Sequence, residues 1–355
     1  MSQTMLMPAA EEVQYVEYHA GGKPGRRPIL RGEKAFKTFD EIPVVDLSKM
    51  TSPVLAERKE VAKSIYKVCT EVGFFYATNH TVSLDVIDET FVAVKAFFAL
   101  PTEVKMEAYM RKHPEFRGYE PFFDLRLDPT TRGDFKEAFV MASDATDSAQ
   151  NLPFPAKSGP PANNWPTQDG DALRRALTKY YNHVNAFSRQ LLRLFALALD
   201  LDEDYFEAMT SFPMASIRAL HYPPQQSPDV YDIGIGAHTD YSWFTVLLQQ
   251  DGVQSLEVLN KNGIWVPAPP IRGSFVINIG DFLQLLTNHK FLSTVHRVFN
   301  NSGKERYSIP FFLSPNAEAN IDVLPSCRKP GETYETINAG EYHAMRLQSA
   351  RKPVN

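Results

Sequence analysis

A change of apolar period near residue 214 is the feature that most restricts the fold of this 355-residue chain. Before that position apolar residues recur at helical spacing, and after it they form short β-prone runs separated by Gly, Pro and Asn. The runs cover residues 216–222, 243–249, 255–259, 274–279, 293–299 and 307–313. Short strands at this spacing predict a jelly roll or a barrel.

The part of the chain before this change is predicted to be mainly helical. Its longer segments repeat apolar residues every three or four positions, and Pro and Gly mark several of their ends. In chain order we expect a strand at 42–47, a helix at 53–73, a strand at 74–78, a helix at 83–98 and one long helix at 171–199. Between about 111 and 170 both periods fade and Pro, Gly, Asn and Asp are frequent, which predicts long loops.

Together these elements predict an α+β fold with a jelly-roll core, an amino-terminal helical region and one long buttressing helix. We expect one integrated domain, with the helical region at 41–200 and the jelly roll at 201–355, including a carboxy-terminal helix at 342–347. Residues 1–40 mix Pro, Gly, Arg and Glu without a period. We expect this segment to be flexible or draped over the surface, without visible chemistry.

The composition excludes several classes of function. Net charge is −5 at pH 7, and the basic cluster of Lys23, Arg26 and Arg27 lies among Gly and Pro, so we expect a solvated tail and no nucleic-acid partner. Cys69 and Cys327 lack partners at disulfide or zinc spacing, which fits a reducing compartment. Without a secretory signal or an apolar run of about 20 residues, we expect a cytoplasmic protein and no membrane partner. The sequence does not indicate an oligomeric state.

A His-x-Asp pattern supplies the first candidate for a metal centre. His238 and Asp240 lie in a segment expected to be extended, where side chains two residues apart point to the same face. His296 lies in a β-branched run and is expected to bring a third ligand from across the barrel. Two imidazoles and one carboxylate leave open positions on iron, as in non-haem Fe(II) oxygenases. Each residue alone is weak evidence, because His-x-Asp occurs by chance and a buried His is usually bonded to a backbone carbonyl.

Arg306 and Ser308 repeat the i, i+2 spacing ten residues later. A guanidinium fork beside a hydroxyl suits a carboxylate. The apolar residues 309–312 follow directly, so we expect the anionic partner of Arg306 to lie inside the fold. An Arg taken in isolation is more often part of a surface ion pair.

Five motifs in order give the chain a resemblance to a known family. They are His221-Tyr222-Pro223-Pro224, His238-Thr239-Asp240-Tyr241, Asn278-Ile279-Gly280-Asp281, Ser293-Thr294-Val295-His296-Arg297-Val298 and Arg306-Tyr307-Ser308. Further motifs in the first half include Gly73-Phe74-Phe75, Arg117-Gly118-Tyr119 and Asp134-Phe135-Lys136-Glu137. From about Ile42 to Leu347 the chain resembles the isopenicillin N synthase-like branch of the Fe(II)/2-oxoglutarate-dependent dioxygenases.

The resemblance implies a double-stranded β-helix, that is, a jelly roll buttressed by helices, and an enzyme that uses Fe(II), 2-oxoglutarate and O2, with ascorbate as a supporting reductant. The implied reaction couples decarboxylation of 2-oxoglutarate to succinate and CO2 with hydroxylation, desaturation or oxidative cyclisation of a small molecule. No catalytic residue beyond the metal ligands is implied. The implied iron ligands are His238, Asp240 and His296, and the implied groups for 2-oxoglutarate are Arg306, Ser308 and Tyr222.

Four side chains are candidates for substrate contact: Arg218, Tyr241, Trp243 and Phe312. Arg218 lies four residues before Tyr222 and shares its strand face, which suits an anionic substrate such as an amino acid. A rim Arg paired with a surface acid is the equal alternative, and Trp243 is equally consistent with a core aromatic. A secondary metabolite is the other candidate substrate. His221 is excluded, because strand alternation points it away from the Tyr222 face.

Two other functions stay open at this point. An iron oxidase of the same fold that does not use 2-oxoglutarate would keep the Arg-x-Ser motif for another carboxylate. A non-catalytic protein that binds a small acid would keep the site without turnover. A zinc hydrolase is disfavoured, because no candidate general base accompanies the three metal-binding residues.

Overall fold

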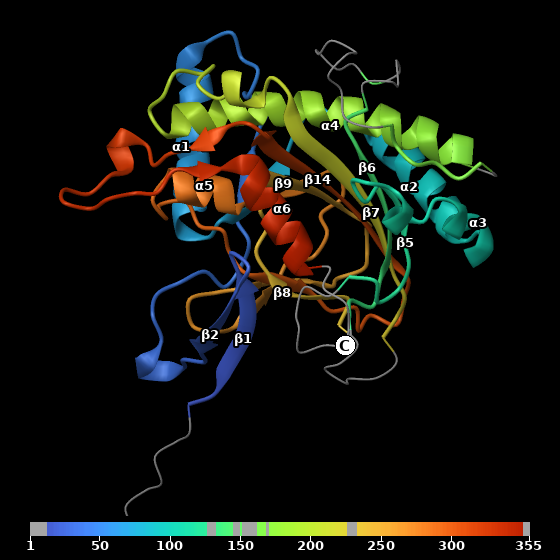
Figure 1. Cartoon of the computed structure of the whole chain (residues 1–355). Helices are drawn as coiled ribbons and strands as arrows, with labels where there is room; N and C mark the ends of the chain where they lie inside the picture. Colours follow the sequence, from blue (N-terminus) through green and yellow to red (C-terminus); the bar gives the residue numbers. More distant parts are fainter. Residues whose placement is uncertain are drawn as a thin grey trace, which may run out of the picture.

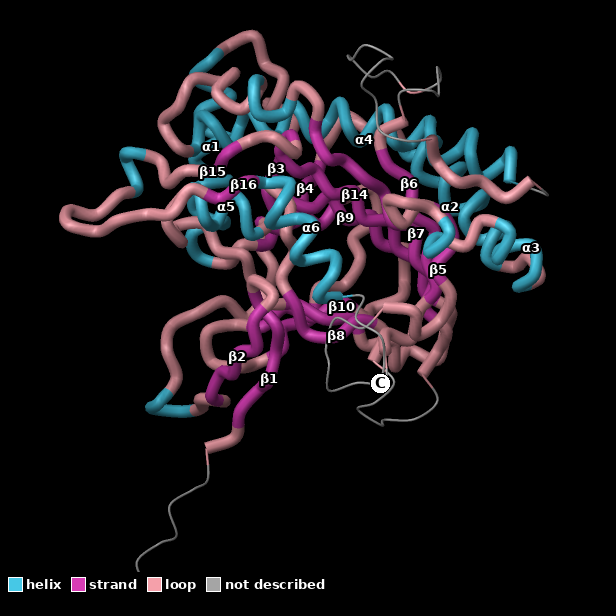
Figure 2. Tube along the Cα trace, in the orientation of Figure 1, coloured by secondary structure: helices cyan, strands magenta, loops and turns pink. Residues whose placement is uncertain are grey.

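Two curled sheets face each other and form the core of the protein (Figures 1 and 2). The computed structural model describes residues 13–125, 133–144, 150, 162–167, 170–225 and 233–350. In the larger sheet the neighbours are β3 (Val44–Asp46), β4 (Phe74–Thr78), β12 (Phe275–Ile279), β9 (Phe244–Gln249), β14 (Arg306–Asn316), β7 (Pro213–Tyr222), β6 (Glu137–Ala142) and β5 (Gly118–Glu120). In the smaller sheet they are β11 (Trp265–Pro267), β10 (Leu256–Leu259), β13 (His296–Val298), β8 (Ile235–His238), β1 (Tyr15–Ala20) and β2 (Lys23–Pro28).

Helices cover the outer face of the larger sheet, and the long helix α4 runs across it beside α1 and α2 (Figure 1). The helices are α1 (Leu55–Glu71), α2 (Leu84–Phe98), α3 (Thr102–Glu107), α4 (Gly170–Ala198), α5 (Asp281–Leu286) and α6 (Ala339–Ala350). A small sheet of β15 (Asn320–Ile321) and β16 (Ile337–Asn338) precedes α6. Within the described ranges, none of these helices is long and apolar enough to cross a membrane.

Side-chain alternation along β7 and β14 separates two apolar clusters. Ile217 and Phe311 belong to the cluster that also contains the buried residues of α4, so they face the helices. Leu220 and Tyr222 belong to a second cluster with residues of the facing sheet, such as Val258, and therefore face the interior between the sheets. Because successive residues of a strand point to opposite faces, the interior face of the barrel is available to polar residues such as Arg306 and Ser308.

The predicted α+β jelly roll is confirmed, and α1, β4, α2 and α4 lie within a few residues of their expected bounds. The region 111–170, expected to be loops, contains β5 and β6. These short strands pair with each other, and β6 pairs with β7, so neighbouring strands stabilise them despite weak local patterns. The carboxy-terminal helix α6 is longer than expected at both ends.

The amino-terminal segment also differs from the expectation of an irregular tail. Residues 15–28 form the antiparallel hairpin β1–β2, and β1 joins the smaller sheet beside β8. Gly21 and Gly22 have positive φ of 59° and 76° at its turn, a conformation that glycine adopts without strain. Residues 1–12, which were also expected to be flexible or draped over the surface, lie outside the described residues.

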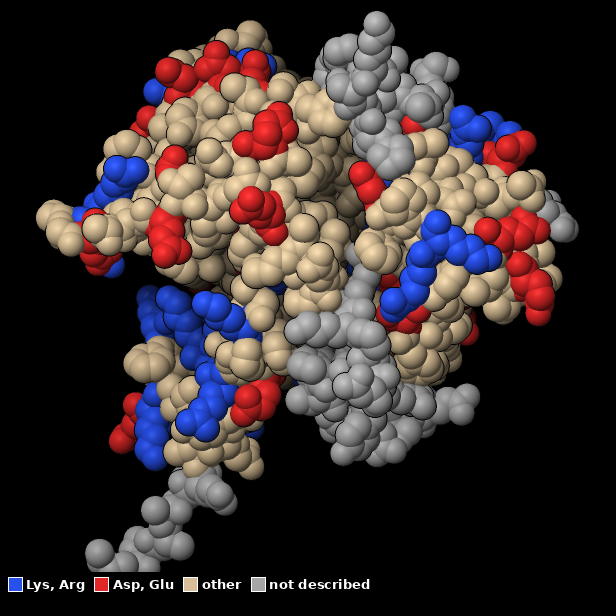
Figure 3. All heavy atoms as spheres, in the orientation of Figure 1, with Lys and Arg blue, Asp and Glu red and all other residues tan. Residues whose placement is uncertain are grey.

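The basic cluster expected to be solvated belongs to this hairpin, where Lys and Arg gather in Figure 3. Arg27 donates to the carbonyls of Leu259 and Asn260 at 3.0 and 2.7 Å, and Arg26 lies 4.8 Å from the ring centroid of Tyr15. Arg27 therefore ties β2, at one edge of the smaller sheet, to the end of β10 in the same sheet.

Gly280 connects β12 to α5 where the backbone passes close to Ser242. An added Cβ at Gly280 would lie 2.1 Å from the carbonyl oxygen of Ser242. We expect Gly280→Ala to lower the free energy of unfolding by about 1–3 kcal/mol, the usual effect of overpacking. Urea denaturation of the purified variant measures this, and unchanged stability would contradict the close approach.

Candidate functional site

His238, Asp240 and His296 converge in the interior of the barrel. His238 at the end of β8 is in register with His296 at the start of β13, and Asp240 lies two residues beyond the end of β8. Oδ1 of Asp240 lies 3.5 Å from Nε2 of His238 and 3.8 Å from Nε2 of His296. One donor atom from each residue lies within 4.8 Å of the others. Because metal bonds to these atoms are about 2.0–2.2 Å long, one ion between them can contact all three.

Hydrogen bonds behind these residues orient their donor atoms. The Nδ1 atoms of His238 and His296 lie 2.7 and 3.1 Å from the carbonyls of Gly236 and Thr294, so donation from Nδ1–H leaves Nε2 as the lone-pair donor. Oδ2 of Asp240 accepts from two polar side chains, which leaves Oδ1 facing the imidazoles. These donors are Thr245 Oγ1 at 2.6 Å and Asn278 Nδ2 at 2.8 Å.

The electrostatics of the site favour the protonation states that metal binding requires. Burial, and then the neighbouring His238, lowers the pKa of His296 to about 4. Burial by itself raises the pKa of Asp240, but His296, His238 and the Thr245 hydroxyl outweigh it, so the pKa lies well below its usual range. At neutral pH His296 is therefore neutral and Asp240 ionised, as metal ligands must be.

Arg306, Ser308 and Tyr222 form a cationic pocket on the inner face of the larger sheet, which faces the smaller sheet that carries His238 and His296. Arg306 and Ser308 are two residues apart on β14, and Tyr222 is in register with Arg306 on β7. The guanidinium donates to Ser308 Oγ at 3.3 Å and to Gln249 Oε1 at 3.2 Å, and it lies 4.8 Å from the centroid of the Tyr222 ring.

Arg306 is 1% exposed, and its partners in the described part of the chain are Ser308, Gln249 and Tyr222, none of which is a carboxylate. Its Nε is buried and has no hydrogen-bond partner among the same residues. A buried cation without an anion is costly, so the pocket is suited to an anionic ligand that completes its hydrogen bonds. The residues therefore fit both groups implied by the sequence, a metal ion and a carboxylate-bearing co-substrate.

Arg218 lies on the interior face of β7, two positions from Leu220 and four from Tyr222. Its Nη2 forms an ion pair with Glu120, which also pairs with Lys136, and both of these partners are 1% exposed. The acid that pairs with Arg218, Glu120, is thus buried, whereas the alternative considered from the sequence placed Arg218 at the rim beside a surface acid. Nε of Arg218 is buried without a partner in the described ranges.

The other candidates for substrate contact differ in position. Phe312 is partly exposed and is in register with Thr245, the residue that holds Asp240. Trp243 has no exposed surface and packs against Phe206 and Phe282 at ring-centroid distances of 5.3 and 5.9 Å. Trp243 is therefore a core aromatic of the apolar cluster that contains the buried residues of α4, and the sequence-based expectation that it contacts substrate is not supported.

His221 faces the opposite side of β7, as strand alternation predicted. Its ring nitrogens lie 2.7 Å from Glu137 and 2.5 Å from Glu305. It contributes nothing to the interior pocket.

His19 is an interior residue that the sequence interpretation missed. It is in register with His238 in the parallel pair β1–β8. Its neighbours Tyr18 and Ala20 pack on the outer face of the sheet with Ala237, so His19 shares the inner face with His238. Its Nδ1 is buried and unpartnered among the described residues. The Gly-Gly pair after it was the available signal for a hairpin, but no local pattern indicates pairing with β8.

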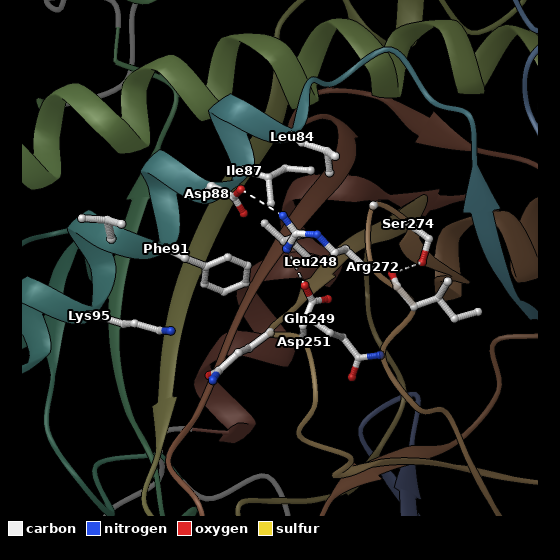
Figure 4. Close-up of a pocket in the computed structure, with 14 residues that line it drawn as sticks. Leu84, Ile87, Asp88, Phe91, Lys95, Leu248, Gln249, Asp251, Arg272 and Ser274 are labelled. Atoms are coloured by element: carbon white, nitrogen blue, oxygen red, sulfur yellow. Dashed lines mark hydrogen bonds and ion pairs between the residues drawn. The ribbon is translucent and has the colours of Figure 1, made fainter.

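A separate hollow of about 340 Å³ lies outside the barrel, between α2 and the end of β9 (Figure 4). Arg272 at the edge of the hollow pairs with Asp88 at 3.1 Å and Asp251 at 2.7 Å, so the charge of this guanidinium is already neutralised by two carboxylates. Gln249 borders this hollow and also holds Arg306, which marks where the hollow and the interior pocket approach each other.

Comparison with known proteins agrees with this geometry. The model of the 2OG-Fe(II) oxygenase superfamily matches residues 213–315, and that of the non-haem dioxygenase in morphine synthesis N-terminal region matches 42–168. The chain is 34% identical over 365 residues to the 2-oxoglutarate-Fe(II) type oxidoreductase ppzC of Metarhizium rileyi, covering 98% of this chain and 97% of that protein. It is 32% identical to the homoarginine-6-hydroxylase 2-ODD-C23.1 of Arabidopsis thaliana, covering 88% and 98%.

A solved structure is similar over a comparable length. A full-length protein of Neurospora crassa, crystallised in complex with alpha-KG, matches with a TM-score of 0.77 at 27% identity, covering 88% of this chain and 98% of that chain. The predicted cofactors, Fe(II) and 2-oxoglutarate, and the predicted oxidation of a small molecule are thereby confirmed. This chain belongs to the 2OG-Fe(II) oxygenase superfamily.

Proposed function

We propose that the enzyme oxidises a small molecule bearing a carboxylate or a similar oxygen acceptor. In this proposal His238, Asp240 and His296 bind iron, and Arg306, Ser308 and Tyr222 bind the distal carboxylate of 2-oxoglutarate. The observation that carries it is that both groups line the interior between the two sheets: three oriented donor atoms come from the smaller sheet and the residues just after its strand β8, and the larger sheet brings a buried guanidinium that lacks an anion among the described residues. The outcome, hydroxylation, desaturation or oxidative cyclisation, depends on where the substrate carbon lies.

The side chains of the site have distinct tasks in this mechanism. His238 and His296 present Nε2 because the backbone holds Nδ1, and Asp240 presents Oδ1 because Thr245 and Asn278 hold Oδ2. Bound Fe(II) supplies the redox chemistry by which O2 oxidises a C–H bond while 2-oxoglutarate becomes succinate and CO2.

Arg306 anchors the co-substrate by the end remote from the reaction. Its two Nη atoms are already oriented by Ser308 and Gln249, so little ordering is needed when a carboxylate binds. The Tyr222 ring beside the guanidinium restricts its movement and brings a hydroxyl to the same pocket.

Arg218, Tyr241 and Phe312 are proposed to contact the substrate. Arg218 has N–H donors left after its pair with Glu120, and Phe312 offers an apolar face near Asp240. The names of similar proteins support a small polar substrate: one is a homoarginine-6-hydroxylase, and the Neurospora crassa protein has also been solved with thymine. An amino acid or a secondary metabolite with a carboxylate is therefore the substrate class to test first.

A turnover screen tests this function. Purified protein with Fe(II), 2-oxoglutarate and ascorbate is incubated with amino acids and secondary metabolites, and succinate and O2 are measured together. We expect substrate-dependent release of succinate. Consumption of O2 without succinate would instead favour the oxidase without 2-oxoglutarate. If no Fe(II) and 2-oxoglutarate charge-transfer band appears, the small-acid-binding protein without catalysis is favoured.

Arg218→Met is expected to raise KM for a carboxylate-bearing substrate found in the screen. Loss of a charge-assisted hydrogen bond costs about 1.5–3 kcal/mol, which is roughly 10- to 150-fold. KM for 2-oxoglutarate should stay unchanged, because Arg306 binds it separately. Arg193→Met, which removes only a surface cation paired with Glu207 at 3.4 Å, is the matched control. An unchanged substrate KM in the Arg218 variant would reject this role.

A further inference from the structure

Thr239, the residue between His238 and Asp240, is held from two sides. Its hydroxyl accepts a hydrogen bond from the backbone N–H of Gly21 at 3.1 Å, and its carbonyl accepts one from Nη2 of Arg346 at 2.9 Å. Gly21 is in the turn of the hairpin β1–β2, and Arg346 is on α6. The turn of the amino-terminal hairpin and the carboxy-terminal helix α6 (both labelled by element in Figure 1) therefore meet at the short segment between two proposed iron ligands.

Arg346 is also part of a buried ion pair. Its Nη1 contacts Oδ2 of Asp281, the first residue of α5, and the side chains are 7% and 4% exposed. Tyr342, one helical turn earlier on α6, donates to the same carboxylate oxygen at 2.9 Å. The guanidinium lies 5.1 Å from the ring centroid of Tyr241, which limits its movement further.

Asp281 extends this network to both segments that carry the proposed ligands. Its backbone N–H donates to the carbonyl of Asp240 at 2.8 Å. Its Oδ1 accepts from Oγ of Ser293 at 2.8 Å, three residues before His296. The ion pair of Arg346 and Asp281 thus contacts the chain at three places: Arg346 binds Thr239, and Asp281 binds Asp240 and the segment just before β13.

Such a network is sensitive to loss of one charge. Breaking a buried ion pair by removing one partner leaves the other charge uncompensated in a low-dielectric environment. Groups behind metal ligands fix ligand geometry, and their loss typically weakens metal binding by about 10- to 100-fold. A ligand triad requires placement within about 0.5 Å to bind tightly.

We propose that Arg346 is a positioning residue of the iron centre, and that docking of α6 through Arg346 is required for tight iron binding. The carboxy-terminal helix then sets the spacing of the ligands without contacting the metal. This inference rests on the proposed role of His238, Asp240 and His296 as iron ligands.

Anaerobic titration of the apo-protein with Fe(II) alone tests the inference. We expect Arg346→Met to raise the Kd for Fe(II) by about 10- to 100-fold, and to reduce the rise in melting temperature that Fe(II) produces. Circular dichroism of the apo-protein should be unchanged. Arg346→Lys keeps a charge opposite Asp281 but lacks the fork that reaches Thr239 at the same time, so its Kd should be intermediate.

Met345→Gln is the matched control, because Met345 is the neighbouring residue of α6 and is 48% exposed. Its Kd should equal that of the wild type. A folded Arg346→Met with wild-type affinity, or an equal loss in Met345→Gln, would overturn the inference. If Arg346→Met does not fold, wild-type affinity in Arg346→Lys overturns it instead. Failure of the wild-type protein to bind Fe(II) would reject the proposed iron site itself.

Discussion

Asp240→Ala is expected to abolish 2-oxoglutarate turnover and to remove Fe(II) binding. Asp240 supplies the one anionic donor of the triad, and its Oδ1 is the atom that faces both imidazoles. The loss of Fe(II) affinity should exceed the roughly 10- to 100-fold that follows loss of a group behind a ligand. Titration of the Fe(II) and 2-oxoglutarate charge-transfer band, together with succinate release, measures both effects.

The matched control for this prediction is Asp251→Ala. Asp251 is an exposed acid that pairs with Arg272 at 2.7 Å and borders the hollow outside the barrel. Its removal changes the net charge equally and should leave the band and the succinate rate unchanged. If Asp240→Ala, shown to be folded by circular dichroism, kept the wild-type rate, the triad would not be the iron site.

Arg306→Ala is expected to raise KM and Kd for 2-oxoglutarate strongly. Truncating one partner of a buried, hydrogen-bonded charge pair costs about 2–5 kcal/mol, which is roughly 30- to 4,000-fold in affinity. Fe(II) binding in the absence of 2-oxoglutarate should remain near the wild-type value, because Arg306 is not among the metal-binding group. Separate titrations with Fe(II) alone and with Fe(II) plus 2-oxoglutarate distinguish an effect on Fe(II) affinity from an effect on 2-oxoglutarate affinity.

Arg306→Lys and Arg272→Ala complete this test. Lysine keeps the charge but cannot form two parallel hydrogen bonds, so the affinity of Arg306→Lys for 2-oxoglutarate should lie between those of the wild type and Arg306→Ala. Arg272 is 60% exposed by side chain, and its loss should leave the affinity unchanged. Equal 2-oxoglutarate affinity in wild type and Arg306→Ala would mean that another cation binds the distal carboxylate.

Much of the fold could be predicted because its elements have strong local patterns. The long helix α4 buries a continuous apolar face, and β9 and β12 are buried along their whole length. The strands β5 and β6 were missed because each is stabilised by a neighbour that is distant in sequence. The hairpin β1–β2 was missed for the same reason, since its partner β8 lies more than 200 residues later.

In the candidate site too, arrangements within one strand could be predicted from the sequence, and contacts between distant segments could not. The pairs His238 with Asp240 and Arg306 with Ser308 are two residues apart, so strand geometry alone predicts that they share a face. Whether Arg218 faces a surface acid or a buried one could not be decided, because Glu120 is 98 residues away in sequence. The core position of Trp243 likewise depends on Phe206 and Phe282 from two other segments.

The sequence by itself determined the chemistry of this protein: which donor atoms are present, and which pairs of them a single strand presents together. Tertiary structure decided that His296 stands opposite His238, that Arg306 is buried without an anion among the described residues, and that Arg346 holds Thr239. The physical reason is the separation along the sequence of the residues that interact. Backbone geometry orients residues within a strand, whereas burial and register between strands depend on the packing of the whole chain.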